Sequence, residues 1–524
     1  MDQARLPEMP EPPAAQNQPR RPRLAPPKLK PINREQGILR PLMVEELVGP
    51  EHKVRAIWDL TGGLDLSGYL ERIQSAEGAA GCSAWDPRLL LSVWVYAYSE
   101  EVTSAREIEG MMAYEPGLMW LAGLGEVNHH TLSDFRGAYP QALHKVLTDF
   151  LAILSQEGYV KLELVAHDGT KIRTQGGSDQ FRRKKTLAEA RAMAQRKVAE
   201  LEQAAEGEEK PNARRAAARM RAARERLARM EQAAEELQKI EAQKAEGEKQ
   251  QARVCWSEPE ARLMKHGDHA MAPSYNLQMS TTAGDSFVVG MHLTQASSDS
   301  GALPQAMAEV QAATGSPPKA VVVDGGFTNR ESIVAMKAAE IEMYGSLVAP
   351  EVRQAASMKA AGIDPAFGPA AFVALPGGTG EAGALRCPAG QTLDYVGQSR
   401  KREDLYARYR AAAADCGGCP FQKQCCPKHA HQGRMVSIRM TENAEVAALR
   451  EKMKTPEAQA IYKRRGPVAE FPNAWLKEKF GLRKFRMRGL KKATCEAMMA
   501  VLTYNIMQWR RLSWLPKQTV TEAV

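Results

Sequence analysis

The chain has 524 residues, of which 44% are hydrophobic, and its 71 Lys and Arg residues exceed its 62 Asp and Glu residues to give a formal net charge of +9. This length allows two or three domains with a sizeable core, and the positive charge favours a polyanionic partner without proving one. Because no run of about 18 apolar residues is present and the acidic, Pro-rich start is unlike a signal peptide, we expect no membrane span and a location in the cytoplasm.

The N-terminal part of the chain is expected to be helical after a disordered start. Residues 1–34 are polar and rich in Pro, which is typical of a disordered tail. Residues 35–158 carry helical periodicity and predict an all-α N-terminal domain. Within this domain, Asp86 and Pro87 are expected to be the N-cap and the first residue of one helix.

From residue 161 the pattern changes to that of a mixed α/β sheet. The stretch KLELVAHDGT predicts a strand that ends at Asp168, and two strands joined by a hairpin turn at 283–285 follow later. The stretch KAVVVDGGF predicts a buried strand that ends at Asp324, with a helix before it, a helix after it and a further strand at 342–350. This order of elements fits a mixed sheet with helices on its faces.

A charged, Ala-rich insertion at 183–250 interrupts the sheet. Its apolar residues alternate spacings of three and four, which is a heptad seam, and the stretch 206–212 breaks the block. We therefore expect a hairpin of two antiparallel helices, which is either a solvated spacer arm or an arm for dimerisation or for clamping DNA. The spacer is the simpler interpretation, because charged helix faces are usually solvated. The seam comprises Ala213, Ala216, Met220, Ala223, Leu227, Met230, Ala234 and Leu237.

A second insertion at 351–445 contains Gly and Cys residues and is expected to be irregular, without an evident core. The pair Cys416 and Cys419 has the spacing of a zinc knuckle and predicts a structural Zn²⁺ site; the alternative is a set of reduced thiols in a loop. The expected ligands are Cys387, Cys416, Cys419 and Cys425, with Cys426 as a substitute for Cys425 and His429 and His431 as spare candidates. Cys82, Cys255 and Cys495 are expected to be ordinary buried thiols.

Two carboxylates stand at the ends of predicted strands, and a third is isolated among cations. If the strands of Asp168 and Asp324 are neighbours, the two carboxylates lie side by side and repel each other unless a cation such as Mg²⁺ lies between them. The alternative is that each Asp only caps the turn that follows it. Glu470 can share one helical face with Lys477, and it is either a further metal ligand or the ion-pair partner of a nearby Arg.

These motifs, in this order, resemble those of bacterial insertion-sequence transposases of the DDE type over roughly residues 38–512. HDGTKIRT resembles the first-Asp motif, YNLQ the strand that follows, VVVDGGFTNRES the second-Asp motif, and YKRRGPVAEFPNAWLK the signature around the catalytic Glu. TLSDFR, with the helices before it, resembles the N-terminal domain, and RGLKKATCEAMMAVLTYNIMQW resembles the closing helix. One departure is that Phe471 follows Glu470 where many relatives have Pro.

The resemblance implies an α/β fold, with a ribonuclease-H-like catalytic domain at 159–512 that holds both insertions. An all-α DNA-binding domain at 35–158 precedes it, and a tail at 513–524 follows. The resemblance further implies that Asp168, Asp324 and Glu470 are catalytic and hold two Mg²⁺ or Mn²⁺ ions for cleavage and strand transfer at phosphodiesters.

The implied partners are double-stranded DNA, as the terminal inverted repeats of the element and the target site, bound by a homo-oligomer in the bacterial cytoplasm near the nucleoid. The residues expected to contact DNA are Tyr462, Arg464, Arg465, Lys477, Arg483, Lys484, Arg486 and Arg488. Phe480 and Phe485 interleave with the basic residues, which favours DNA contact over a solvated charged face. The alternatives are a catalytically inert DNA-binding descendant and a divalent-metal nuclease without strand transfer.

Overall fold

The computed structural model describes residues 41, 43–75, 83–205, 213–347, 350–375, 383–401 and 404–515, and its helices and strands lie within one compact unit, Val44–Val524. The expected disordered tail at 1–34, the expected break at 206–212 and Cys82 lie outside the described residues. Across the described ranges, no helix is long and apolar enough to cross a membrane.

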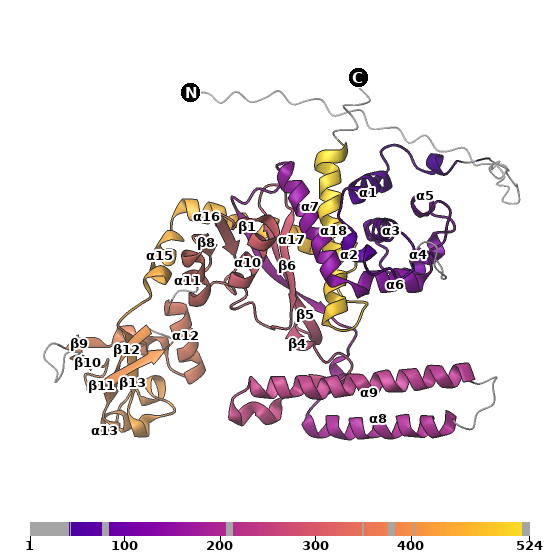
Figure 1. Ribbon diagram of the computed structural model, residues 1–524. Coiled ribbons are helices and arrows are strands. Elements are labelled where there is room, and N and C mark those ends of the chain that lie inside the picture. Colours follow the sequence, from indigo (N-terminus) through magenta and orange to yellow (C-terminus); the bar gives the residue numbers. More distant parts are fainter. Residues whose placement is uncertain are drawn as a thin grey trace, which may run out of the picture. The chain divides into compact units, whose positions relative to one another are not determined.

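Short helices surround one buried helix in the N-terminal region (Figure 1). The buried helix, α3 (Pro87–Ser99), begins as the sequence predicts, because the Asp86 side chain accepts a hydrogen bond from Arg88 N and Pro87 is the first helical residue. The last long helix of the chain, α18 (Leu490–Trp509), packs against α3, so the helical region and the sheet share one hydrophobic core. The other helices are η1 (Val44–Leu47), α1 (Lys53–Gly62), α2 (Ser67–Leu70), α4 (Ala105–Met111), α5 (Pro116–Ala122), α6 (His129–Ala138) and α7 (Pro140–Gln156).

The second region is a six-stranded mixed sheet, which confirms the predicted α/β class and the helical N-terminal region. The strand order is β4-β5-β1-β7-β8, with β6 also paired to β5. β1 runs antiparallel to β5 and parallel to β7, and β7 runs parallel to β8. The strands are β1 (Val165–Arg173), β4 (Arg262–Lys265), β5 (Met271–Thr282), β6 (Val288–Thr294), β7 (Ala320–Val323) and β8 (Glu342–Gly345), with helices α10 (Leu303–Thr314) and α11 (Arg330–Ala338).

Two long helices, α8 (Lys184–Ala205) and α9 (Ala213–Ala242), follow β1 and lie side by side (Figure 1). A two-stranded ribbon of β2 (Phe181–Arg182) and β3 (Val254–Cys255) closes their base. A small core there contains Leu187, Leu237 and Val254. The apolar seam of α9 is therefore covered by α8.

The expectation that 351–445 is irregular and lacks a core is wrong. The region holds α12 (Pro350–Ala361) and a five-stranded antiparallel sheet, ordered β13-β12-β11-β10-β9, with a hydrophobic core of its own. Alternate residues of β12 are buried, and that period of two was obscured by the surrounding Gly and Cys residues. The strands are β9 (Val373–Leu375), β10 (Ala384–Arg386), β11 (Thr392–Lys401), β12 (Asp404–Ala411) and β13 (Met435–Arg439).

The basic C-terminal segment consists of several helices with a break between them rather than one continuous helix. Helices α15 (Ala444–Lys452), α16 (Pro456–Lys463) and α17 (Arg465–Ala474) are followed by a π-helical turn, Trp475–Lys479. Residues 480–489 then leave the helix, and Gly481 and Gly489 both have positive φ angles there. A last π-helical turn ends at Trp514, which is buried two residues beyond the expected domain end.

Candidate active site

Asp168 and Asp324 lie on neighbouring parallel strands. Val165 pairs with Val321 and Ala166 with Val322, so the same register continued by two residues sets Asp168 beside Asp324. The Oδ1 atom of Asp324 also accepts from Gly326 N at 2.7 Å, so this carboxylate caps its own turn as well. Asp324 therefore caps its own turn and also lies beside Asp168, so the two interpretations of Asp324 do not exclude each other.

The environment of Asp168 disfavours its charge. Burial, followed by repulsion from the Asp324 carboxylate, raises the pKa of Asp168 to about 6, while Arg465 acts in the opposite direction. Its Oδ1 atom accepts from Gly169 N at 3.0 Å and its Oδ2 atom from Asn473 Nδ2 at 3.3 Å. These two hydrogen bonds do not offset the repulsion between the Asp168 and Asp324 carboxylates. A cation between the two carboxylates would therefore be bound favourably.

Helix α17 and the turn after it bring further polar groups to Asp168. Asn473 is buried, and its Oδ1 atom has no hydrogen-bond partner among the described residues. Lys477 is partly buried, and burial lowers its pKa while the nearby Asp168 carboxylate opposes that shift. Two carboxylates with an adjacent orphaned amide oxygen are hard oxygen donors, so the residues present fit a divalent metal ion such as Mg²⁺.

Glu470 is not drawn into the same cluster. It is exposed on α17, about one turn before Asn473. In the described ranges, no group of three or more His, Cys, Asp or Glu side chains is arranged to hold a metal ion. The structure thus brings Asp168 and Asp324 together and leaves the Glu470 carboxylate outside a three-carboxylate group.

A polar network on the opposite face of β1 escaped the sequence reasoning. His167 is fully buried and shares hydrogen bonds with Ser280 Oγ at 2.9 Å and Gln278 Oε1 at 3.0 Å. Burial lowers the pKa of His167 to about 4. Gln278 Nε2 and Asn276 Nδ2 both donate to Asp299 Oδ1, at 2.9 and 2.7 Å.

This network reaches the backbone of both catalytic candidates. A Cβ at Gly169 would meet Asp299 Oδ1 and Gln278 Nε2, each at 2.4 Å, so any side chain beside Asp168 would displace this network. A Cβ at Gly326 would lie 3.0 Å from Asp324 Oδ1 and 3.9 Å from Asp299 Cβ. Asp299 therefore lies between the backbone of Gly169 and the turn that carries Asp324. Alternating polar residues in the otherwise buried strand β5 were the signal that could have found it.

The predicted DNA-contacting residues fall into two groups. Arg483, Lys484, Arg486 and Arg488 are exposed on a loop whose backbone extends the end of β1, with Phe485 N donating to Arg173 O at 2.9 Å. In the second group, Arg465 and Lys477 lie near Asp168, Tyr462 packs partly buried against the core, and Arg464 is exposed and donates to Ala283 O at 3.4 Å.

The role expected of Phe480 and Phe485 is wrong. Phe480 is 2% exposed and Phe485 is 0% exposed, so neither ring can stack on a base. The aromatic rings instead fix the basic loop to the core, and the cations alone face solvent. An aromatic residue between cations can either stack on a base or pack into the core, and only the tertiary structure distinguishes the two.

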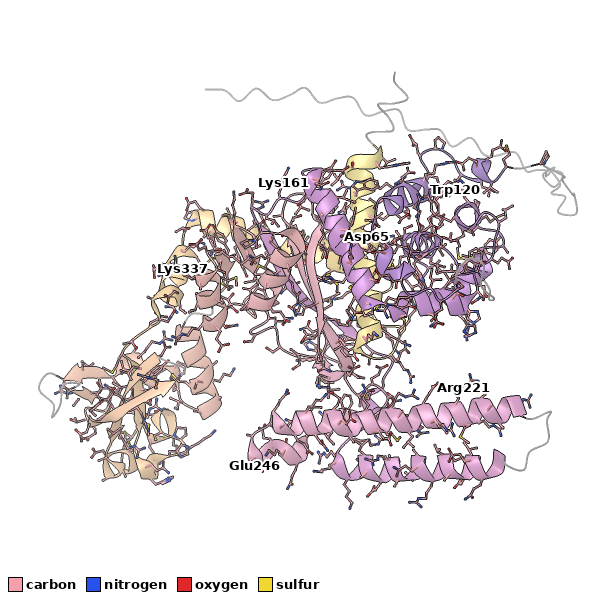
Figure 2. All side chains as sticks on the ribbon, viewed as in Figure 1. Asp65, Trp120, Lys161, Arg221, Glu246 and Lys337 are labelled. Atoms are coloured by element: carbon pink, nitrogen blue, oxygen red, sulfur yellow. The ribbon has the colours of Figure 1, made fainter. Side chains whose placement is uncertain are left out.

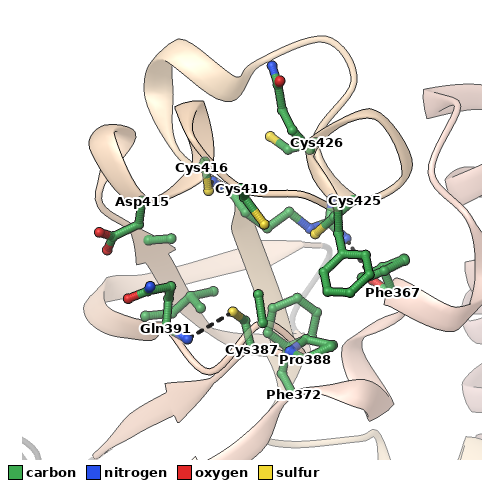
Figure 3. A pocket seen from close by; sticks show the side chains of 16 residues that line it. Phe367, Phe372, Cys387, Pro388, Gln391, Asp415, Cys416, Cys419, Cys425 and Cys426 are labelled. Carbon is green, nitrogen blue, oxygen red and sulfur yellow. Dashed lines mark hydrogen bonds between the residues drawn. The ribbon is translucent and has the colours of Figure 1, made fainter.

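The cysteines line a pocket in the second sheet region. Figure 3 shows Cys387, Cys416, Cys419, Cys425 and Cys426 around it, and His429 and His431 are not among its lining residues. Gln391 N donates to Cys387 Sγ at 3.3 Å and Arg434 N to Cys416 Sγ at 3.2 Å. Burial raises the pKa of Cys425 to about 11, which keeps that thiol neutral. Cys255 and Cys495 are buried, as predicted.

Paired carboxylates at the edge of a mixed sheet, beside an exposed basic loop, are typical of enzymes that transfer phosphoryl groups on nucleic acids. Residues 43–138 match the family model described as transposase domain (DUF772), and residues 386–510 match the one described as transposase DDE domain. No curated protein matches the chain. The chain therefore carries a transposase DDE domain and an N-terminal transposase domain.

A DDE domain implies a ribonuclease-H-like fold, DNA as a partner and a divalent metal ion. The matched range 386–510 contains Glu470 and most of the cysteine-bearing sheet. Asp168 and Asp324 precede the matched range, so their assignment depends on the strand register and the electrostatics described above.

Proposed function

We propose that this protein is a DNA transposase that cuts and joins the ends of its own insertion sequence. The observation that carries the proposal is the adjacent Asp168 and Asp324 pair, with the unpartnered Asn473 oxygen beside it, in a chain with a transposase DDE domain. Two Mg²⁺ or Mn²⁺ ions, when bound, would activate the attacking oxygen and stabilise the departing oxygen at a phosphodiester.

Asp168 and Asp324 are the residues that hold the metal ions in this proposal, and Glu470 is the third carboxylate. Glu470 is exposed on α17, so its carboxylate is accessible from solvent. Arg465 and Lys477 lie close enough to Asp168 to influence its charge, and they place cations where a scissile phosphate would bind.

Asp299 is a positioning residue in this proposal, because its carboxylate accepts hydrogen bonds from amides of β5. Its Oδ1 atom holds two amides of β5 and lies against Gly169, and its Cβ lies near Gly326. It therefore fixes the relative position of the two backbone segments that carry Asp168 and Asp324. An error of about 1 Å there is enough to cost a large factor in rate.

The domain assignments follow the same proposal. The helical region at 35–158 binds DNA, the region at 159–512 is catalytic with insertions at 183–250 and 351–445, and the exposed basic loop holds the DNA backbone near the cleaved end. The protein acts as a homo-oligomer on paired element ends.

Zn²⁺ is the proposed occupant of the cysteine pocket. Cys387, Cys416, Cys419 and Cys425 approach it from different segments, and two of them already accept backbone N–H bonds of the kind that support thiolate ligands. Closing the set requires the sulfur atoms to move together, since the described side chains form no metal-holding group as they stand.

The decisive experiment is cleavage of a labelled duplex carrying the DNA that flanks this gene, with Mg²⁺ or Mn²⁺. Wild type should cut at the element end and join that end to a second duplex. Glu470→Gln should bind without cutting, whereas Glu457→Gln, the same change at an exposed carboxylate on α16, should cut normally. Cutting without joining would favour the nuclease, and binding without cutting by wild type would favour the inert descendant.

A further inference from the structure

Helix α9 carries its cations unevenly along its length. Its first part, 213–229, contains seven Arg residues and one Glu, whereas 230–242 contains four Glu residues and one Lys. A helix whose charges serve only solubility mixes both signs along its exposed face. The segregation gives the part of α9 nearest the 206–212 connection a strongly positive surface.

Four of these arginines form one stripe. Arg215, Arg219, Arg226 and Arg229 are separated by four, seven and three residues, which puts them on the same flank of the helix, next to the seam that α8 covers. Arg215 and Arg219 are exposed, and within the described residues no carboxylate lies within ion-pair distance of either side chain. They are therefore free to meet a partner.

The same flank faces the body of the protein at the base of the hairpin. Arg226 stacks over the Trp256 ring at 4.8 Å, Ala233 is fully buried, and Glu236 forms an ion pair with Arg262 at 2.8 Å. Beyond Arg226 these contacts end and the stripe continues into solvent. The two helices, with Arg221 on α9, are visible in Figure 2.

We propose that three arginines of this stripe, Arg215, Arg219 and Arg226, bind the phosphate backbone of duplex DNA and make the hairpin an arm on the substrate, whereas Arg229 is partly buried and pairs with Glu225 at 3.8 Å. The inference rests on the proposed function, because the duplex is the DNA whose end is cut. α9 has 30 residues and is about 45 Å long, which equals about 13 base pairs of duplex. Dimerisation through the seam is excluded as its main use, because α8 already covers the seam.

The test compares two duplexes that carry the same element end, one of about 10 base pairs and one of about 40 base pairs. Arg215→Gln/Arg219→Gln should bind the long duplex about tenfold or more weakly at 0.1 M salt, and its slope of log affinity against log salt should be smaller by about 2. Cleavage of the short duplex should be unchanged. Gln has a helix propensity close to that of Arg, and equal far-ultraviolet circular dichroism establishes that the helices remain.

The control is Arg196→Gln/Arg221→Gln, which removes the same charge at exposed positions off the stripe. An unchanged affinity and salt slope in Arg215→Gln/Arg219→Gln would overturn the proposal, and so would an equal loss in the control. If wild type neither binds nor cuts either duplex, the proposed function itself fails and this inference fails with it.

Discussion

Replacing Asp168 by Asn should stabilise the protein at neutral pH. Burial and the Asp324 carboxylate raise the pKa of Asp168 from 3.8 to about 6. At about 1.4 kcal/mol for each pH unit, keeping this carboxylate charged at pH 7 costs about 3 kcal/mol relative to the unfolded chain. An amide has no charge to desolvate, so Asp168→Asn removes this cost.

The gain depends on pH in a defined direction. Because the pKa of Asp168 is higher in the folded chain, the group stabilises the fold below about pH 4, and this contribution is lost as the pH rises through about 6. The variant should therefore match wild type near pH 4 and exceed it near pH 7. The new amide keeps the bond from Gly169 N, and a rotated Asn473 amide can accept from it through the Oδ1 atom that the described residues leave unpartnered.

Thermal unfolding between about pH 4 and pH 8 measures the effect, and midpoints are compared because a chain of this size does not unfold in one step. Asp134→Asn, the same change at an exposed carboxylate on α6, should leave Tm unchanged at every pH. Mg²⁺ should raise the Tm of wild type more than that of Asp168→Asn. A variant that is less stable than wild type at pH 7 would refute the burial and repulsion assigned to Asp168.

Four other variants test separate parts of the protein. Asp299→Asn should raise the Mg²⁺ concentration needed for half-maximal cleavage while leaving DNA binding in gel shifts intact; an unchanged metal dependence would remove Asp299 from the positioning network. Phe485→Ala removes a fully buried ring, a change that costs about 3–5 kcal/mol in protein cores, and should lower the midpoint of urea denaturation, whereas Lys484→Gln should weaken DNA binding and leave that midpoint unchanged. Cys416→Ser/Cys419→Ser should lose bound Zn²⁺ by metal analysis, and wild type purified without zinc would contradict that site.

The position of Asp324 directly after a strand was predictable because the signal is local, whereas the predicted end of the first strand at Asp168 is wrong, because β1 continues to Arg173. A charged residue directly after a run of Val is costly unless something binds it, and Asp324 follows Val321, Val322 and Val323. The strand pairing then sets Asp168 beside Asp324, which is the arrangement that the sequence made conditional on neighbouring strands. The sequence predicts a site residue such as Asp324 when the signal lies within the strand that carries it.

Asp299 and Asn473 were not predictable in the same way. Asp299 lies in a loop after β6, and its role comes only from amides on β5 and from two glycines on other segments. Asn473 reaches Asp168 only because α17 packs on β1. Neither residue has a neighbour in sequence that marks it, so the information lies in the tertiary arrangement.

Buried carboxylates hold the backbone of the basic loop, residues 480–489, although its exposed cations repel one another. Glu496 accepts from Arg486 N and Met487 N, and Glu258 accepts from Gly489 N, so buried carboxylates fix the backbone of the loop. Burial raises the pKa of both Glu496 and Glu258, which means that each is destabilising as a charged group. Burial disfavours the charge of Asp168 at the candidate site in the same way. A protein keeps such a cost where function requires it, and binding a metal ion and DNA would require both the Asp168 carboxylate and the basic loop.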